Sequence, residues 1–301
     1  MRKTFKTQPS LFVFGAALDH PSLHGLDDTE AVLDWARLEA LMKEIYASET
    51  GRPSYPLLTL LRGLLLGIWY KLSDEELASS LARDLLFRRF CRLELSADIP
   101  DATTLGRFRQ QLVEHDLWEK LLGEVNQQLE DQQVIMTQGR VNIIDATPVE
   151  AGQSGPGKGV DEHGFIHRQT VTPGNVHDSR GHDTLLLGDE SQLYADAAYS
   201  SAETQEKLAR FGIDDRVQRK GYRNHPLSVP DHQRSKEIAV TRSGGERPFA
   251  TYKRLYGLAR TRFVGLDKNL TFYDLAAMAS KIRKGAKFLT LYGNREPAAT
   301  G

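Results

Sequence analysis

The chain has 301 residues, a formal net charge of −1, 40% hydrophobic residues and 26% charged residues. This length allows about two domains and excludes a single small binding module, and the composition excludes a disordered chain. The longest apolar stretch, Leu57 to Tyr70, is interrupted by Thr59, Arg62 and Gly63, so it is too short for the roughly 18 to 20 residues of a membrane span. A single cysteine, Cys91, excludes an internal disulfide. We therefore expect a cytoplasmic protein with no membrane partner.

The first half of the chain shows the apolar spacing of helices. Helices are predicted over 29–47 and 57–70, from Ser73 towards residue 90, after a cap at 100–104, and over 117–129. Ser73 is followed by three acids, which suit a helix N-terminus. We expect an N-terminal arm over residues 1–24 and an all-α domain over 25–132.

The second half changes to short β-branched and apolar runs. Strands are predicted over 140–145, 164–172, 191–196 and 215–218, and helices over 201–211, 245–258 and 270–288. The glycine-rich segment 152–159 and the segment 222–235 are predicted as loops. Strands mixed with helices favour an α/β domain, which we place at residues 138–291, with a flexible tail over 292–301.

Three acids stand where a metal site could form. Asp145 and Asp196 each end a predicted strand, and Glu246 lies on a predicted helix that could pack across the sheet. Two-metal phosphoryl chemistry uses carboxylates that converge on two divalent ions about 3.5 to 4 Å apart. The chain holds 40 acids, so three solvated surface carboxylates are the alternative interpretation.

Basic residues gather in the second half although the net charge is close to zero. Residues 242–268 contain seven Lys and Arg against only Glu246 and Asp267, and four more bases follow between 281 and 287. On a helix, Lys253 would lie about two turns from Glu246 on nearly the same side. Such a stretch can neutralise DNA phosphates; a solvated helix face is the alternative.

These motifs resemble the DDE transposases of bacterial insertion sequences, in particular the insertion-sequence-five family. The family's Y-x2-R-x3-E-x6-K signature is matched by Arg242, Glu246 and Lys253, whereas Ala239 stands at the Tyr position. Segments 144–151 and 194–199 look like the first and second catalytic motifs. Segments 51–56, 72–76 and 100–109 are similar to the helical domain, so the resemblance covers roughly residues 25 to 290.

The resemblance implies an enzyme that cuts and joins DNA on a ribonuclease-H-like domain, a mixed sheet with flanking helices. It implies that Asp145, Asp196 and Glu246 are catalytic and hold Mg²⁺, for which Mn²⁺ can substitute. The partners would be the element's terminal inverted repeats and target DNA, bound by a homodimer associated with the nucleoid. Contacts to DNA are expected from a set of basic residues: Arg242, Arg247, Lys253, Arg254, Arg260 and Arg262.

One departure from the family concerns the sheet. The glycine-rich segment 152–159 runs directly into the next predicted strand, and about 30 residues of the family's pattern have no counterpart. Loss of a strand would leave backbone groups of its neighbours unpaired, at about 1 to 3 kcal/mol for each buried group. We therefore expect a catalytic domain that is shortened around residues 152–160 and lacks one strand, and hypothesise an internally deleted, inactive copy.

Two other functions remain open from the sequence. A DNA-binding remnant without catalysis would regulate transposition and bind DNA without divalent metal. A metal-dependent nuclease would cut DNA strands without joining them.

Overall fold

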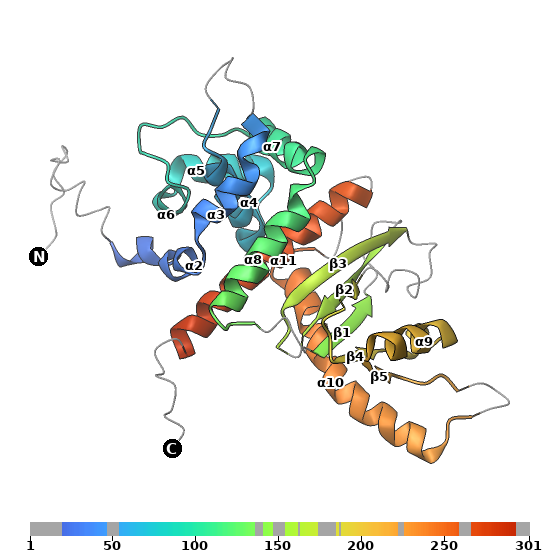
Figure 1. Cartoon of the computed structure of the whole chain (residues 1–301). Helices are drawn as coiled ribbons and strands as arrows, with labels where there is room; N and C mark the ends of the chain where they lie inside the picture. The colour runs from blue at the N-terminus through green and yellow to red at the C-terminus, as the bar shows by residue number, and fades with distance from the viewer. Residues whose placement is uncertain are drawn as a thin grey trace, which may run out of the picture.

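The computed structural model describes residues 20–46, 54–135, 141–146, 154–161, 163–173, 185–186, 188–221, 226–258 and 266–292. Side chains are described at these positions except 46, 145–146, 154–158, 171–173, 244–247, 249 and 266–267. In Figure 1 the helices of the first half form one lobe and the sheet lies in a second. The last helix, α11 (Leu266–Tyr292), crosses between the two lobes (Figure 1).

The first lobe is entirely helical in the described residues, as predicted. Its elements are η1 (Pro21–His24), α2 (Asp27–Ala31), α3 (Trp35–Met42), η2 (Lys43–Tyr46), α4 (Leu57–Tyr70), α5 (Asp74–Arg83), α6 (Leu85–Phe90), α7 (Ala102–Glu114) and α8 (Leu117–Asp131). Ser73 starts α5 with a capping box, since its hydroxyl accepts from the Glu76 N–H while the Glu76 carboxylate accepts from the Ser73 N–H. Such reciprocal bonds satisfy two donors that the helix itself leaves unpaired.

The single helix predicted over 29–47 is wrong, because this segment forms α2, α3 and η2. Asp34 divides it: its backbone is extended, and its carboxylate accepts from the Ala36 N–H at 3.0 Å. This bond starts α3 in a new direction. An Asp competes with the helix for backbone donors in this way, and apolar periodicity alone does not reveal it.

One hydrophobic core joins the helical lobe to the sheet. It runs from α4, where Leu61 and Leu65 are fully buried, through the buried face of α11 to Val160 and Ile166 of the sheet. The Trp69 indole N–H also donates to the Ala279 carbonyl of α11 at 2.8 Å. The two domains expected from the sequence therefore share their interior.

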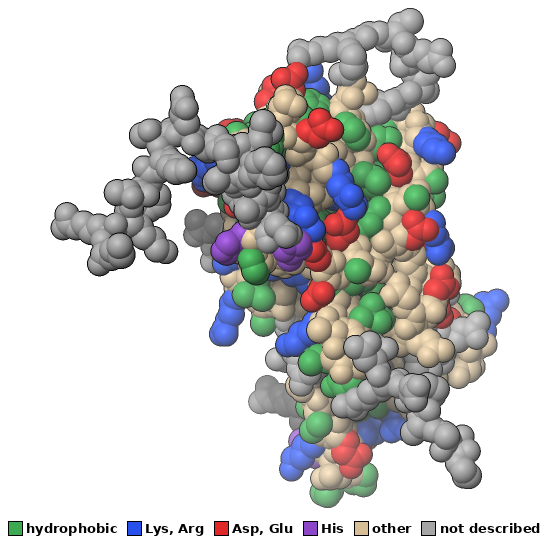
Figure 2. Space-filling view, turned by 90° about the vertical axis from the view of Figure 1, so that its left-hand side faces the viewer, with side chains coloured by type: hydrophobic (Ala, Val, Ile, Leu, Met, Phe, Trp, Pro, Cys, Tyr) green, Lys and Arg blue, Asp and Glu red, His purple; other side chains and the backbone are tan. Residues whose placement is uncertain are grey.

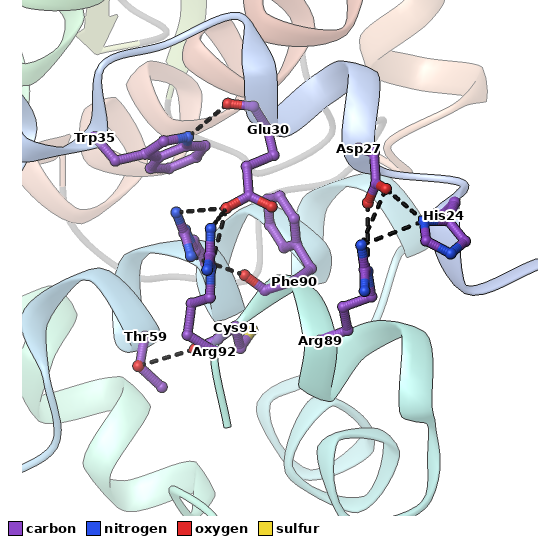
Figure 3. A network of polar contacts seen from close by, with 10 residues as sticks. His24, Asp27, Glu30, Trp35, Thr59, Arg89, Phe90, Cys91 and Arg92 are labelled. Atoms are coloured by element: carbon purple, nitrogen blue, oxygen red, sulfur yellow. Dashed lines mark hydrogen bonds and ion pairs between the residues drawn. The ribbon is translucent and has the colours of Figure 1, made fainter. Parts of the chain in front are cut away.

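A buried arginine ties α4 to its neighbours (Figure 3). The Arg62 side chain is 4% exposed; it donates to Glu30 Oε1 of α2 at 3.1 Å and to the Phe90 carbonyl of α6 at 3.1 Å. Its guanidinium lies 4.5 Å from the centre of the Trp35 ring. Arg92, which is 69% exposed, donates to the same Glu30 oxygen from the surface. A buried charge is stable only when it is paired and hydrogen-bonded in this manner.

The sheet has five strands in the order β3-β2-β1-β4-β5. They are β1 (Val141–Ala146), β2 (Ser154–Val160), β3 (Ile166–Pro173), β4 (Gln192–Ala195) and β5 (Asp214–Val217). The first three pair antiparallel, and β4 and β5 run parallel to β1. The short η5 (Ala197–Tyr199) and α9 (Ala202–Phe211) connect β4 to β5, and α10 (Val229–Arg254) follows β5.

The predicted loss of a strand is wrong. The glycine-rich segment that was expected to be a loop is part of β2, which pairs with β3 over 154–160 and with β1 over 157–160. Its glycines alternate along the strand, at 155, 157 and 159, so they share one face. A Cβ at Gly159 would come within 2.9 Å of Asn142 Oδ1 and 3.2 Å of the Leu185 carbonyl oxygen. Close packing on that face excludes a side chain, so glycine is required here despite its low strand propensity.

The predicted start of the helix that carries Glu246 is also wrong. The segment 222–235 was expected to be a loop, yet α10 begins at Val229 and continues through Gly244, Gly245 and Pro248. Ser228 caps the helix by accepting from the Asp231 N–H at 3.2 Å, and Pro230 lies in the first turn, where a missing N–H costs nothing. Pro248 is buried and α10 contacts β1 and β4, so tertiary packing outweighs the local cost of a helical proline.

Candidate active site

The two predicted aspartates lie at the same level of neighbouring parallel strands. In the register of β1 and β4, Ile143 pairs with Tyr194. Asp145 and Asp196 each follow two residues later, so they occupy equivalent positions at the carboxyl ends of the two strands. Neighbouring strands are about 4.8 Å apart. The topology thus brings these two positions together at one sheet edge.

Alternation along the strands assigns a face to each position. Ile144, Leu193 and Ala195 belong to the core cluster that includes Leu208 of α9. Positions 145 and 196 are one residue further along, so they belong to the opposite face. Val160 of β2 shares that opposite face through its pairing with Ile143 and joins the core that contains α11.

The third predicted carboxylate lies on the helix that contacts both of these strands. Glu246 is in α10, which packs against β1 and β4. Two arginines anchor this helix beside β5: Arg234 donates to the Val217 carbonyl at 3.0 Å, and Arg242 donates to Gln218 Oε1 at 3.1 Å. The backbone therefore unites the three elements that carry Asp145, Asp196 and Glu246.

Of the three acids, Asp196 is the one whose side chain is described. Its carboxylate caps η5, with Oδ1 accepting from the Ala198 N–H at 2.8 Å. This bond fixes the direction of a half-exposed carboxylate. A fixed carboxylate oxygen is a ligand of the kind that Mg²⁺ prefers.

The predicted DNA contacts fall into three groups. Arg242 is half-buried against Gln218, whereas Lys253 and Arg254 are exposed at the end of α10. The side chain of Arg247 lies outside the described set. Arg260 and Arg262 lie outside the described residues altogether.

No three described side chains of His, Cys, Asp or Glu come together in a way that could hold a metal ion. This statement does not cover Asp145 and Glu246, whose side chains are not among those described. The donor set of three carboxylates nevertheless fits Mg²⁺ or Mn²⁺, because these ions favour oxygen ligands.

Sequence reasoning missed the residue opposite the first aspartate. In the β1–β2 register, Asp145 pairs with Lys158. Because 152–159 was expected to be a loop, its lysine was not assigned a position. The alternation of glycine with larger residues over 154–160 was the available signal for a strand.

The seam between β3, α8 and α11 holds buried polar pairs that the sequence did not reveal. Gln169 Nε2 donates to Asp274 at 3.0 Å, and His167 Nε2 lies 2.9 Å from Asp161. Burial raises the pKa of Asp274 to about 7, partly offset by the bond from Gln169. Burial alone would raise the pKa of Asp161, but the partnership with His167 holds that pKa below its usual value. A space of about 460 Å³ lies beside His167, Gln169 and Asp274.

A helical N-terminal part followed by a mixed five-stranded sheet with flanking helices is the architecture of a ribonuclease-H-like DDE domain. Two family models match the chain: Transposase domain (DUF772) over residues 18–111 and Transposase DDE domain over residues 136–281. Together they support a DDE transposase of the insertion-sequence type. The second match contains all three predicted catalytic positions.

No described helix is both long and apolar enough to cross a lipid bilayer.

Proposed function

We propose that this chain is the transposase of a bacterial insertion sequence of the insertion-sequence-five family. It would bind the terminal inverted repeats of its element, cleave DNA there and join the freed ends to target DNA. The observation that carries the proposal is the shared level of Asp145 and Asp196 on neighbouring parallel strands, with the Glu246 helix packed against both. Three carboxylates from separate elements are what two-metal phosphoryl transfer requires.

In this proposal Asp145, Asp196 and Glu246 together hold two Mg²⁺ ions, with Mn²⁺ as a substitute. When bound, the metals supply charge stabilisation to the in-line displacement at phosphorus. The chain's own part is to fix the geometry. The Ala198 N–H orients Asp196, and the anchoring of α10 through Arg234 and Arg242 sets the position of Glu246 relative to the sheet.

Lys253 and Arg254, exposed near the end of α10, would hold the DNA backbone in this proposal, as would Arg247, Arg260 and Arg262. Arg242 would act mainly by positioning the helix, because its guanidinium is engaged with Gln218. Phosphate contacts position the duplex without reading its sequence. Since an element has two ends, we propose that a homodimer acts on DNA, in the cytoplasm and at the nucleoid.

We also propose that the chain is catalytically competent. The hypothesis of an inactive, internally deleted remnant rested on a missing strand, and the described sheet has five strands with β2 paired on both sides. The structural reason for favouring a non-catalytic DNA-binding regulator, a missing strand, therefore no longer holds. The regulator remains an outcome of the test below.

The test is cleavage of duplex DNA carrying the element's ends by the purified chain, with and without Mg²⁺. Glu246→Gln should abolish cleavage and leave DNA binding intact, because it removes one metal-ligand charge and keeps the side-chain size. Glu237→Gln, an exposed acid two and a half turns earlier on the same helix, is the matched control and should cut normally. Joined products distinguish a transposase from a nuclease. Binding without metal-dependent cutting by the unaltered chain would refute catalysis and favour the regulator.

A further inference from the structure

The end of α4 touches the end of α10. Lys71 follows α4 in a left-handed conformation, with φ of 57°, and its ammonium donates to the Arg254 carbonyl. Its side chain also lies beside Gly257, where a Cβ would come within 3.7 Å of Lys71 Cδ. A cation at a helix C-terminus is favourable because the last carbonyls carry partial negative charge. The helical lobe thus holds the end of the helix that carries Glu246.

The last helix passes the same place. The Arg283 guanidinium of α11 lies 5.0 Å from the centre of the Trp69 ring and 5.4 Å from that of Tyr70, next to Lys71 in the chain. Tyr70 is 40% exposed. Lys287 lies one helical turn beyond Arg283 and is exposed. Three elements far apart in the sequence therefore present cations and an aromatic ring around one junction.

Acids are scarce in the segments that form this junction. Residues 247–266 contain no Asp or Glu, and neither do residues 275–292. The acids closest to Lys71 in the sequence are the three that start α5. Asp74 is paired with Arg109, and Glu76 caps the Ser73 N–H, which leaves Glu75 as an exposed charge. On the face that carries α2 and α6, in contrast, acidic and basic side chains are interspersed (Figure 2).

We propose that Tyr70, Lys71, Arg254, Arg283 and Lys287 form a basic seam that binds the backbone of duplex DNA as it leaves the catalytic site. This inference rests on the proposed function and adds a part of the helical lobe to the DNA path. Arg254 is eight residues after Glu246 on α10, or about 12 Å along the helix. At 3.4 Å for each base pair, the seam meets the duplex three to four base pairs from the reacting phosphate.

A purely structural role for these residues is the competing explanation. Lys71 and Arg283 both make contacts that hold α4, α10 and α11 together. Arg254 and Lys287 separate the two explanations, because their side chains are exposed. Binding of DNA by the seam requires all four charges, at Lys71, Arg254, Arg283 and Lys287. A junction that only joins helices requires Lys71 and Arg283 alone.

The experiment measures binding of a fluorescently labelled 20-base-pair duplex of mixed sequence by anisotropy, with EDTA present and at several salt concentrations. The full chain is compared with a double variant, Arg254→Gln with Lys287→Gln. Each phosphate contact contributes about 0.9 to the slope of log affinity against log salt. The double variant should lower the slope by about 2 and, at 0.1 M salt, weaken binding roughly 60-fold.

A matched double variant, Lys120→Gln with Arg210→Gln, removes two exposed charges from α8 and α9 and should leave the slope unchanged. Arg254→Lys with Lys287→Arg should bind like the unaltered chain, since the contacts depend on charge. Melting temperatures confirm that each variant is folded. Normal binding by the Arg254→Gln and Lys287→Gln chain, or an equal loss in the control, overturns the seam alone. If the unaltered chain binds no duplex, the proposed function fails with it.

Discussion

The pairing of Glu30 with two arginines allows a direct comparison of a buried and an exposed ion pair. Glu30→Gln keeps the side-chain shape and removes the charge that faces Arg62, which is 4% exposed. Breaking a buried pair by removing one partner costs about 3 to 5 kcal/mol. Because the Glu30 side chain is itself 22% exposed, we expect the lower end, about 3 kcal/mol. Arg92→Gln removes a 69% exposed partner of the same carboxylate and should cost at most about 1 kcal/mol.

Urea unfolding followed by tryptophan fluorescence measures both effects. All three tryptophans, Trp35, Trp69 and Trp118, lie in the helical lobe, so the signal reports the region that contains the pair. With an m value of about 2 kcal/mol per molar urea, Glu30→Gln should lower the midpoint by about 1.5 M and Arg92→Gln by at most about 0.5 M.

The double variant completes a cycle that removes the Arg92 contribution from the Glu30 result. Equal losses in the two single variants would refute the reasoning. So would a Glu30→Gln chain that unfolds at the wild-type urea concentration, since the Phe90 carbonyl and the Trp35 ring would then stabilise the Arg62 guanidinium without a carboxylate.

Four further substitutions test other contacts. The folded pKa of Asp274, about 7, lies above the unfolded value of about 3.9, so the stability that this carboxyl contributes is complete below about pH 4 and is lost as the pH rises through 7. Asp274→Asn mimics the protonated form, so its advantage in free energy of unfolding should grow from pH 5 to pH 8, by about 2.5 kcal/mol; urea titrations that show a constant difference would contradict this. Gly285→Ala should lower the free energy of unfolding by about 1 kcal/mol, because its Cβ would meet a fully buried leucine side chain of α8 at 2.8 Å. Gly123→Ala, with no atom within 4 Å of the new Cβ, should raise the free energy of unfolding by about 0.5 to 1 kcal/mol. Gly159→Ala should reduce DNA cleavage more than DNA binding, since it displaces Asn142, three residues before Asp145 on β1; unchanged cleavage by a folded variant would argue against that link.

The sequence predicted the parts of the fold whose signals are local. The apolar pattern of α4 gave a helix with the right limits, and the capping residues at Ser73 gave the right start for α5, although the helix predicted towards residue 90 is divided at Asp84 into α5 and α6. The runs that end at Asp145 and near Asp196 gave the strands of the site. Their shared level is not local information. The equivalent positions of Asp145 and Asp196 depend on which strands pair and in which register. The local sequence does not encode the pairing of two strands that are about 50 residues apart.

The two errors near the site have one physical cause. Glycine and proline were interpreted by their intrinsic preference, which disfavours strands and helix interiors. In β2 a Cβ at Gly159 would lie 2.9 Å from Asn142 Oδ1 and 3.2 Å from the Leu185 carbonyl oxygen, so a side chain there would force its neighbours to shift. In α10 the buried Pro248 sits in a helix held against β1 and β4. Packing from distant segments outweighed local propensity at both places.

The course of α11 explains why the helical lobe matters to the site. Ala276, Ala277 and Ala279 are fully buried, which allows this helix to pass close to both α4 and α8 while its other contacts reach β2 and β3. Because α10 ends against Lys71 of the same lobe, displacement of α4 would move the end of the Glu246 helix as well as α11. If the proposed site is correct, the helical lobe takes part in setting the relative positions of the elements that carry Asp145, Asp196 and Glu246.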